Sequence, residues 1–433
     1  MAVFAVGGLV APPSVATGST APQIQQWIDA AEPGATVRIP PGVHVGNLVV
    51  DKPLHLQGES GAEIRGAGYG KTIEVIAPDV TIEGLLITNS GRNLVNDDAA
   101  IHVSADRTTL RNNHIANSLH GIYLKKAKDY HIVGNTITGT AATSENDPTG
   151  PGDGPENCDA SALPGGAGNG IHQWNCSGGV IEDNTITHSR DGMYFYFTDH
   201  GLIKNNAVSH VRYGLHYMYS DDNHFEGNRF FRNAGGAAVM LSERLTILHN
   251  DFVDNRGGRA TGLILLSVDD SRIEGNRIEG NSLGLSLNQC NRNRVIGNRV
   301  DGNHIGLHFN GNSDDNQFSA NSFRRNLYPV EMNGESGTSR WEVAGVGNRW
   351  DNVAPVDLNA DGIGDLPHRE LDVLGSLRRD FPSIGLLADS PALQLLRLAH
   401  QRAAFPGFNT IQDNAPLLGT APAAQASGSR PMP

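Results

Sequence analysis

The chain has 433 residues, a formal net charge of −13 and only 38% hydrophobic residues. Nucleic acid and anionic membranes bind to basic protein faces, so this charge balance argues against both as partners. No apolar run approaches the ~20 residues that a membrane span needs.

Residues 1–21 resemble an export signal that has lost its beginning. An apolar stretch, 2–11, is followed by small residues up to Ala16. The basic stretch that should precede it is missing. We interpret 1–21 as a truncated signal segment, with a floppy apolar terminus as the alternative.

Residues 22–35 are predicted to form an amphipathic helix. Ile24, Trp27, Ile28 and Ala31 share one helical face, and Pro33-Gly34 ends the pattern. Because a repeat array needs a cap on its open end, we expect this helix to shield the first strand edge.

An asparagine then recurs about every 22 residues, with an apolar residue three positions before it and another two positions after it. The column is Asn113, Asn135, Asn184, Asn206, Asn228, Asn250, Asn276, Asn298 and Asn321. Such a period indicates one unit stacked on copies of itself. Asn suits the corners because it tolerates left-handed backbone, and stacked amides can bond from coil to coil. The pattern predicts an all-β protein, a right-handed parallel β-helix of about 22 residues per coil over 36–328.

The spacing of 49 residues between Asn135 and Asn184 leaves room for a loop insertion, 141–169, rich in Pro and Gly. A functional loop and a disordered excursion are both open interpretations. Cys158 and Cys176 form the only plausible disulfide pair, which would close this insertion, whereas Cys290 lies too many coils away. Three free thiols are the alternative.

A glycine column sets the register of one strand per coil, and the second and fourth residues after each Gly should point outward. Those positions hold Tyr194, Tyr196, Trp174, Met218 and Met240 among others, which is unusual for a face that meets water.

His216 and Met218 lie two residues apart on one strand, and Met218 should face Met240 at ~4.8 Å on the next coil. Imidazole and thioether are soft ligands that select Cu(I), so these three residues are a candidate copper site. His172, two coils away, could belong to a transfer path. The alternative is that the insertion or a partner simply covers this strip.

Asp pairs at 221–222, 269–270 and 314–315 recur in register, which indicates turn residues and not a catalytic pair. His188 and His210 also recur in register, as do Arg190 and Arg212 beside them. We interpret them as residues stacked at one corner of successive coils.

After residue 328 the repeat is expected to stop, and 329–388 forms a closing segment. Within it, Asp357, Asn359, Asp361 and Asp365 space oxygen atoms as in a calcium loop, although His368 replaces the final Glu of an EF-hand. An Asx-rich turn is the alternative. Residues 389–433 are predicted to be an amphipathic docking helix, capped by Ser390, and a disordered tail.

Several motifs closely resemble the NosD family over residues 22–418. They are Tyr213-Gly-Leu-His-Tyr-Met-Tyr219, Arg190-Asp-Gly-Met-Tyr194, Gly168-Asn-Gly-Ile-His172 and Gly347-Asn-Arg-Trp350 with 357–365 after it. The resemblance implies a periplasmic, non-catalytic accessory protein for maturation of nitrous-oxide reductase. It implies association with an ABC transporter of NosF and NosY, transfer of copper from the lipoprotein NosL to the apo-reductase, and copper ligands at His216, Met218 and Met240.

Two other functions remain open at this stage. A polysaccharide lyase or uronate epimerase would need a general base beside basic residues, because its substrate is a polyanion. The outward columns contain one Lys and no Asp or Glu, which makes this face unsuitable. A passive binding module or adhesin is the third interpretation.

Overall fold

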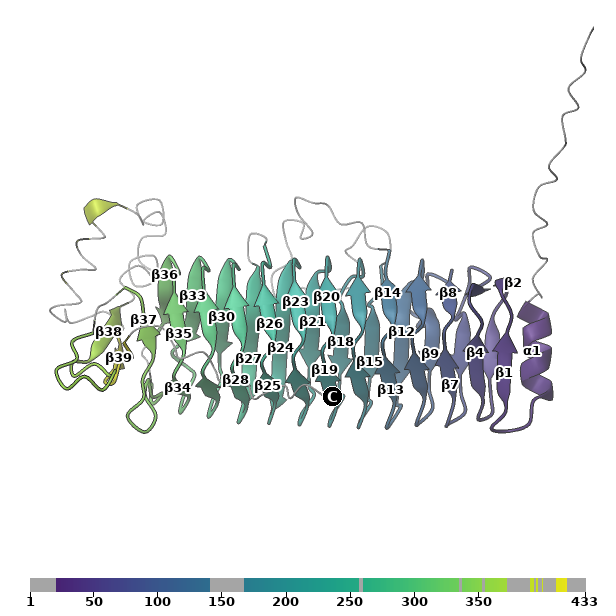
Figure 1. The fold of residues 1–433 in the computed structure, drawn as a ribbon, viewed down its shortest axis with the longest axis horizontal. Helices are drawn as coiled ribbons and strands as arrows, with labels where there is room; N and C mark the ends of the chain where they lie inside the picture. The colour runs from purple at the N-terminus through teal and green to yellow at the C-terminus, as the bar shows by residue number, and fades with distance from the viewer. Residues whose placement is uncertain are drawn as a thin grey trace, which may run out of the picture.

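The computed structural model describes residues 21–140, 167–256, 260–334, 337–352, 355–371, 390–392, 395, 399 and 410–418. The expected export segment, most of the 141–169 insertion with Cys158, and most of the expected helix and tail at 389–433 lie outside these residues. The described chain forms an elongated stack of coils, drawn from α1 at one end to β37 at the other in Figure 1.

Each coil contributes one short strand to each of three parallel sheets. Sheet A contains, in spatial order, β1 (Thr36–Ile39), β4 (His55–Gly58), β7 (Thr81–Glu83), β10 (Thr109–Arg111), β13 (His131–Val133), β16 (Val180–Glu182), β19 (Leu202–Lys204), β22 (His224–Glu226), β25 (Thr246–Leu248), β28 (Arg272–Glu274), β31 (Arg294–Ile296) and β34 (Gln317–Ser319). Sheet B contains β2 (Gly42–Val45), β5 (Ala62–Arg65), β8 (Leu86–Thr88), β11 (His114–Ala116), β14 (Thr136–Thr138), β17 (Thr185–Thr187), β20 (Ala207–Ser209), β23 (Arg229–Phe231), β26 (Asp251–Val253), β29 (Arg277–Glu279), β32 (Arg299–Asp301), β35 (Ser322–Arg324) and β37 (Arg349–Trp350). Sheet C contains β3 (Leu48–Val50), β6 (Ile73–Val75), β9 (Ala99–Val103), β12 (His120–Lys125), β15 (Ile171–Trp174), β18 (Met193–Tyr196), β21 (Tyr213–Met218), β24 (Gly235–Glu243), β27 (Thr261–Asp269), β30 (Leu283–Asn288), β33 (Ile305–Asn310) and β36 (Tyr328–Asn333). The predicted parallel solenoid of about 22 residues per coil is therefore confirmed.

The asparagine column forms the predicted ladder at the corner between sheets A and B. The Oδ1 atom of each Asn accepts the backbone N–H of the Asn one coil earlier, as in Asn184 to Asn206 at 3.0 Å. The side-chain amide then donates to a carbonyl of the preceding coil, as Asn206 does to Ile181 at 2.9 Å. Asn348 extends the ladder beyond Asn321.

The expected reason for Asn at this corner is only half right. The left-handed residue is the one before the ladder Asn, for example Asn205 or Gly227, with φ of 53° and 68°. The ladder Asn is selected because its amide satisfies buried backbone groups that the corner leaves without sheet partners.

A second asparagine column, absent from the prediction, lies at the corner between sheets B and C. It consists of Asn233, Asn255, Asn281, Asn303 and Asn326, bonded in the same way. The glycine column that follows it reflects close approach, since a Cβ on Gly214 would lie 2.6 Å from the carbonyl oxygen of Gly236.

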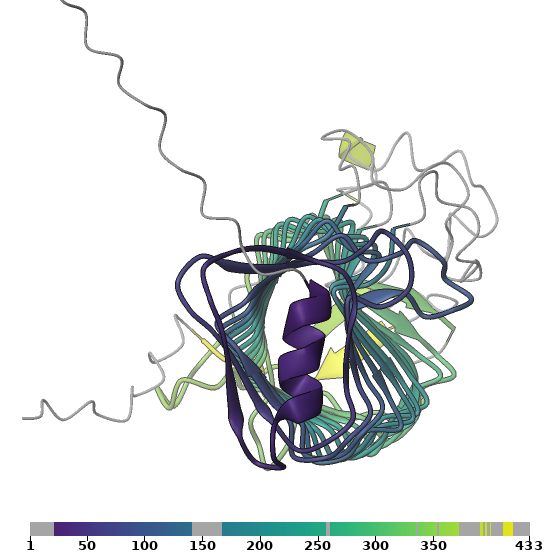
Figure 2. The ribbon, with the colours of Figure 1, turned by 90° about the vertical axis from the view of Figure 1, so that its right-hand side faces the viewer.

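At the N-terminal end, α1 (Ala21–Ala30) lies across the opening of the first coil (Figure 2). Its apolar residues Ile24 and Ile28 are fully buried in the common core. The helix thus covers apolar side chains that the first coil would otherwise expose.

At the other end, the stack runs past residue 328, where the repeat was expected to stop. Strands β36 and β37 each add to a sheet. Beyond them, β38 (His368–Leu371) pairs antiparallel with β39 (Thr410–Asp413). Asp413 takes the place of the next ladder residue, because its carboxylate accepts the backbone N–H of Asn348 at 2.6 Å and the indole N–H of Trp350 at 2.9 Å.

Candidate metal site on the outer face of sheet C

Both expected outward columns of sheet C stack in register. Met218 on β21 pairs with Met240 on β24, and His216 pairs with Ala238. On each strand the side chains alternate between the two faces. Tyr217 and Val239, which precede the two methionines, belong to the hydrophobic core, whereas Met218 and Met240 do not. The thioethers of Met218 and Met240 therefore emerge from neighbouring strands on the same face, at the ~4.8 Å spacing of a sheet.

The burial of this face differs from the expected exposed strip. His216 is only 3% exposed and Met240 8%, while Met218 is half-buried. Aromatic side chains account for part of this, since the ring of Tyr194 lies 5.0 Å from that of His216, edge to face, and Tyr213 lies 5.5 Å away. The site is thus a densely packed surface row in which Met218 is the one ligand candidate that is partly exposed.

Asp191 fixes the orientation of His216. The Nδ1 atom of His216 lies 3.0 Å from Oδ2 of Asp191, which is fully buried. Arg212 donates two hydrogen bonds to the same carboxylate, at 2.8 and 2.7 Å, and its contact with Nδ1 is longer, at 3.4 Å. Because the carboxylate accepts a hydrogen bond from Nδ1–H, the lone pair of the neutral ring lies on Nε2, as in many metal-binding histidines.

Asp191 is ionised in this setting. Burial acts to raise its pKa, but the charge of Arg212 and the hydrogen bonds from His216 and Arg212 outweigh burial and hold the pKa below the ordinary value. Sequence reasoning placed Asp191 only in a corner motif. The available signal was a carboxylate directly before the register Gly192, a position that holds His120, Asn169 and Tyr213 in neighbouring coils and no acidic residue in any other coil with a register glycine.

His172 does not meet the other candidate ligands. It belongs to a row of rings on sheet C, where it stacks on Tyr123 at 4.3 Å and lies tilted against Tyr194 at 4.6 Å. The side-chain amide of Asn169 donates to its Nδ1 atom at 3.0 Å, which places the proton of the neutral ring on Nε2. Burial and then His120 hold the pKa of His172 well below its usual value. A copper ion at His172 would first have to break the bond from Asn169.

Beside the methionines runs an exposed apolar ridge, which we define as Phe197, Tyr219 and Leu241. These residues are 46%, 43% and 42% exposed, and they directly follow Tyr196, Met218 and Met240. All three have left-handed backbone, with φ of 50°, 49° and 52°. Large side chains rarely adopt this conformation. In the flanking coils the same position holds Asn175, Ser267 and Gln289.

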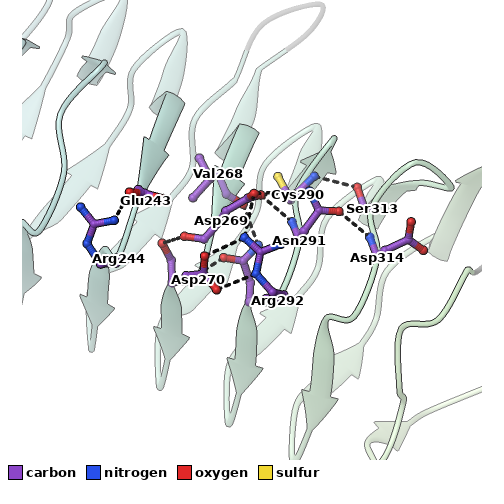
Figure 3. A network of polar contacts seen from close by, with 12 residues as sticks. Glu243, Arg244, Val268, Asp269, Asp270, Cys290, Asn291, Arg292, Ser313 and Asp314 are labelled. Atoms are coloured by element: carbon purple, nitrogen blue, oxygen red, sulfur yellow. Dashed lines mark hydrogen bonds and ion pairs between the residues drawn. The ribbon is translucent and has the colours of Figure 1, made fainter.

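The recurring Asp pairs are turn residues, as predicted. Asp222, Asp270 and Asp315 all have left-handed backbone. Each lies in the turn that connects a strand of sheet C to the strand of sheet A in the next coil. Figure 3 shows Arg292 paired with both Asp269 and Asp270, and Asn291 bonded to Asp269. The positive charge of Arg292 thus balances Asp269 and Asp270 within the turn column.

The 357–365 loop folds as a set of Asx turns. Asp357 accepts the backbone N–H groups of Ala360 and Gly362 at 2.7 and 3.0 Å. Asn359 and Asp361 each accept the N–H group two residues later, at 3.0 and 2.8 Å. Asp365 accepts from Leu358 at 2.5 Å. This matches the alternative interpretation, and calcium binding stays a prediction.

Cys176 does not offer a thiolate. It is buried, and burial raises the pKa of its thiol to about 11. The same holds for Cys290. Within the described part of the chain, no three or more His, Cys, Asp or Glu side chains gather to hold a metal. A soft metal ion on sheet C would therefore depend on the thioethers.

Comparison with known proteins identifies the family. A family model described as "Periplasmic copper-binding protein (NosD)" matches residues 155–354, which include His216, Met218, Met240 and Asp191. A protein of Pseudomonas aeruginosa named "Probable ABC transporter binding protein NosD" is 34% identical over 395 residues, covering 87% of this chain and 86% of its own. The chain belongs to the NosD family. A NosD protein of Stutzerimonas stutzeri with the same description is 32% identical and covers 88% of this chain and 86% of its own.

Among solved structures, the A-module of the mannuronan C-5 epimerase AlgE6 of Azotobacter vinelandii has a similar fold. The TM-score is 0.59 at 15% identity, covering 74% of this chain and 93% of that one. At this identity the likeness concerns the solenoid alone. Among the residues that the structure describes, no helix has the length and apolarity to span a membrane.

Proposed function

We propose that this NosD-family chain is a periplasmic accessory protein for the maturation of nitrous-oxide reductase. It receives Cu(I) at His216, Met218 and Met240 and delivers it to the apo-reductase while docked on an ABC transporter. The observation that carries the proposal is the register of β21 and β24, which puts two thioethers side by side next to an imidazole.

The ligand chemistry supports a transient cargo. Thioether and imidazole are soft, neutral ligands that suit Cu(I). A site without thiolate holds the ion weakly enough for release, and both described cysteines are buried as protonated thiols at neutral pH. Asp191 holds the imidazole of His216 in the tautomer that binds a metal through Nε2.

The surroundings support exchange with another protein. A donor or acceptor that reaches Met218 must also touch Phe197, Tyr219 and Leu241, which protrude beside it. In this proposal the ridge contacts the copper donor NosL and then the apo-reductase, and NosF and NosY form the transporter. The protein has no catalytic residues of its own, contacts the membrane only through the transporter, and does not bind nucleic acid.

An anaerobic titration of the purified protein with Cu(I) tests the site. The Met218→Ala/Met240→Ala double variant is expected to lose the tightest site, with affinity reduced at least a hundredfold. Leu266→Ala is the matched control, because Leu266 follows Met240 in the same column but carries no sulfur. Equal affinity of the wild type and the double variant would remove this site from the proposal.

The arrangement of His216, Asp191 and Tyr194 favours one alternative, a lyase or epimerase acting on an acidic polysaccharide. A histidine oriented by a carboxylate, with a tyrosine beside it, could serve as a general base and acid pair. However, Arg212, the cation that contacts His216, is already paired with Asp191. Incubation with polymannuronate and polygalacturonate, followed by NMR of the sugar, should show neither unsaturated nor epimerised product. Turnover that is lost in His216→Ala would replace the copper proposal.

A further inference from the structure

His188 and His210 occupy equivalent corners of two successive coils, between sheets B and C. Each directly follows a strand of sheet B, β17 or β20, and each has left-handed backbone with φ of 56°. Their rings are parallel within 5°, with centroids 5.4 Å apart. Both side chains are partly exposed. Two imidazoles are thus presented side by side, apart from the row that contains His216.

We propose that His188 and His210 form a separate metal site, which binds one divalent transition ion of the Zn²⁺ type through both imidazoles. Imidazole is a preferred ligand of Zn²⁺, Ni²⁺ and Cu²⁺. A tetrahedral ion with Zn–N bonds of about 2.1 Å needs its two nitrogens about 3.4 Å apart. The parallel rings are 5.4 Å apart and both side chains are partly exposed, so each ring would have to move about 1 Å toward the other to reach this spacing. Water completes the coordination.

The hydrogen bonds of the two rings are compatible with metal binding. Nδ1 of His210 lies 3.1 Å from Oγ of Ser209, and this hydroxyl oxygen can accept a hydrogen bond from Nδ1–H. The lone pair of the neutral ring is then on Nε2. Nδ1 of His188 is buried and has no hydrogen-bond partner among the described residues, so no contact there opposes the same tautomer.

The surroundings lower the pKa of His210, and their positive charge limits the affinity of the site for a cation. Burial, His188 and Arg232 lower the pKa of His210 from its ordinary value. Arg232 occupies the same corner one coil later and is exposed. Its positive charge repels a bound cation. We therefore expect micromolar or weaker binding, which a change at Arg232 would tighten.

The column itself supplies variants that preserve the fold. In two earlier coils the same left-handed corner holds Asn89 and Asn117, with φ of 62° and 48°. His188→Asn and His210→Asn therefore replace each ligand with a residue that this corner already accepts. Unfolding by heat in the absence of metal should show little change in either variant.

Isothermal titration of the full chain with Zn²⁺ tests the site. One Zn²⁺ should bind per chain, and either Asn variant should weaken this binding at least tenfold. Arg232→Gln should tighten it severalfold. Met218→Ala/Met240→Ala should leave it unchanged, because the site is independent of the proposed Cu(I) site. The proposal is wrong if the wild type binds no Zn²⁺, or if the Asn variants bind it as well as the wild type.

Discussion

A single buried carboxylate, Asp191, links the candidate copper ligand to the stability of the coil. It holds His216 at 3.0 Å and Arg212 at 2.7 Å. The side chain of Asn is neutral, so in an Asn variant neither His216 nor Arg212 would face a negative charge. Asp191→Asn should therefore weaken the orientation of His216 and leave the guanidinium of Arg212 without that anion.

We expect Asp191→Asn to lower the Cu(I) affinity about 10- to 100-fold, which is the usual effect of losing a residue that orients a metal ligand. Anaerobic titration below the unfolding temperature measures this. Arg212→Lys is the control, because it keeps a cation beside Asp191 and should change the affinity little. Unchanged affinity in Asp191→Asn would mean that His216 is not a ligand.

The same variant changes the pH dependence of stability. The folded pKa of Asp191 lies below its value of 3.8 in the unfolded chain, so the carboxylate stabilises the fold above that pH and the contribution is lost as pH falls. Asp191→Asn should lower the free energy of unfolding by about 3 kcal/mol at neutral pH. The difference from the wild type should shrink at acid pH. Urea unfolding at several pH values measures both effects, and a constant difference would contradict the role of the charge.

At the scale of the single coil, the ladder Asn determines whether neighbouring coils can stack. Asn228 accepts the N–H of Asn206 and donates to Ile203 and Asn250, all within the buried corner. Asn228→Ala leaves these groups without partners, at a cost of about 1–3 kcal/mol for each buried group. A drop of about 3 kcal/mol in the free energy of unfolding is expected. Asn112→Gly, at an exposed left-handed corner, should be nearly neutral.

The apolar ridge is an element whose conformation opposes stability. Left-handed backbone costs roughly 1–2 kcal/mol for an ordinary residue, and Asn tolerates it better. Leu241→Asn should therefore raise the free energy of unfolding by about 0.5–1 kcal/mol. In the same variant Cu(I) should bind normally but pass more slowly to the apo-reductase, because the contact surface is reduced. A variant that is less stable than the wild type would show that Leu241 is not strained.

For the molecule as a whole, the sequence allows the stack and its registers to be predicted, because each coil contacts only its neighbours. The columns of Asn113 to Asn321, and the pairing of Met218 with Met240, follow from counting residues. The burial of His216 could not be found in this way, since it depends on Asp191 and Tyr194 of the preceding coil. The true end of the stack was also missed, because its last ladder bond comes from Asp413, a residue 65 positions away from Asn348.

This modular construction allows the copper proposal to be tested without changing any ligand. Residues 276–297 form one 22-residue coil that begins with a ladder Asn and ends with Gly297. A second copy inserted between Gly227 and Asn228 preserves the Gly-Asn junction at both ends. It should separate Met218 from Met240 by one more coil, from ~4.8 to ~9.6 Å. The protein should fold with similar stability, but the tightest Cu(I) site should be lost.

The matched control is the same copy inserted between Gly297 and Asn298, beyond both methionines. That variant has the same composition and length, and it should keep the Cu(I) affinity of the wild type. Because only the distance between Met218 and Met240 differs between the two insertions, equal affinity in both would mean that copper does not bridge neighbouring coils. Circular dichroism and thermal unfolding establish that both variants retain the solenoid. The comparison thus separates the position of the ligands from their identity.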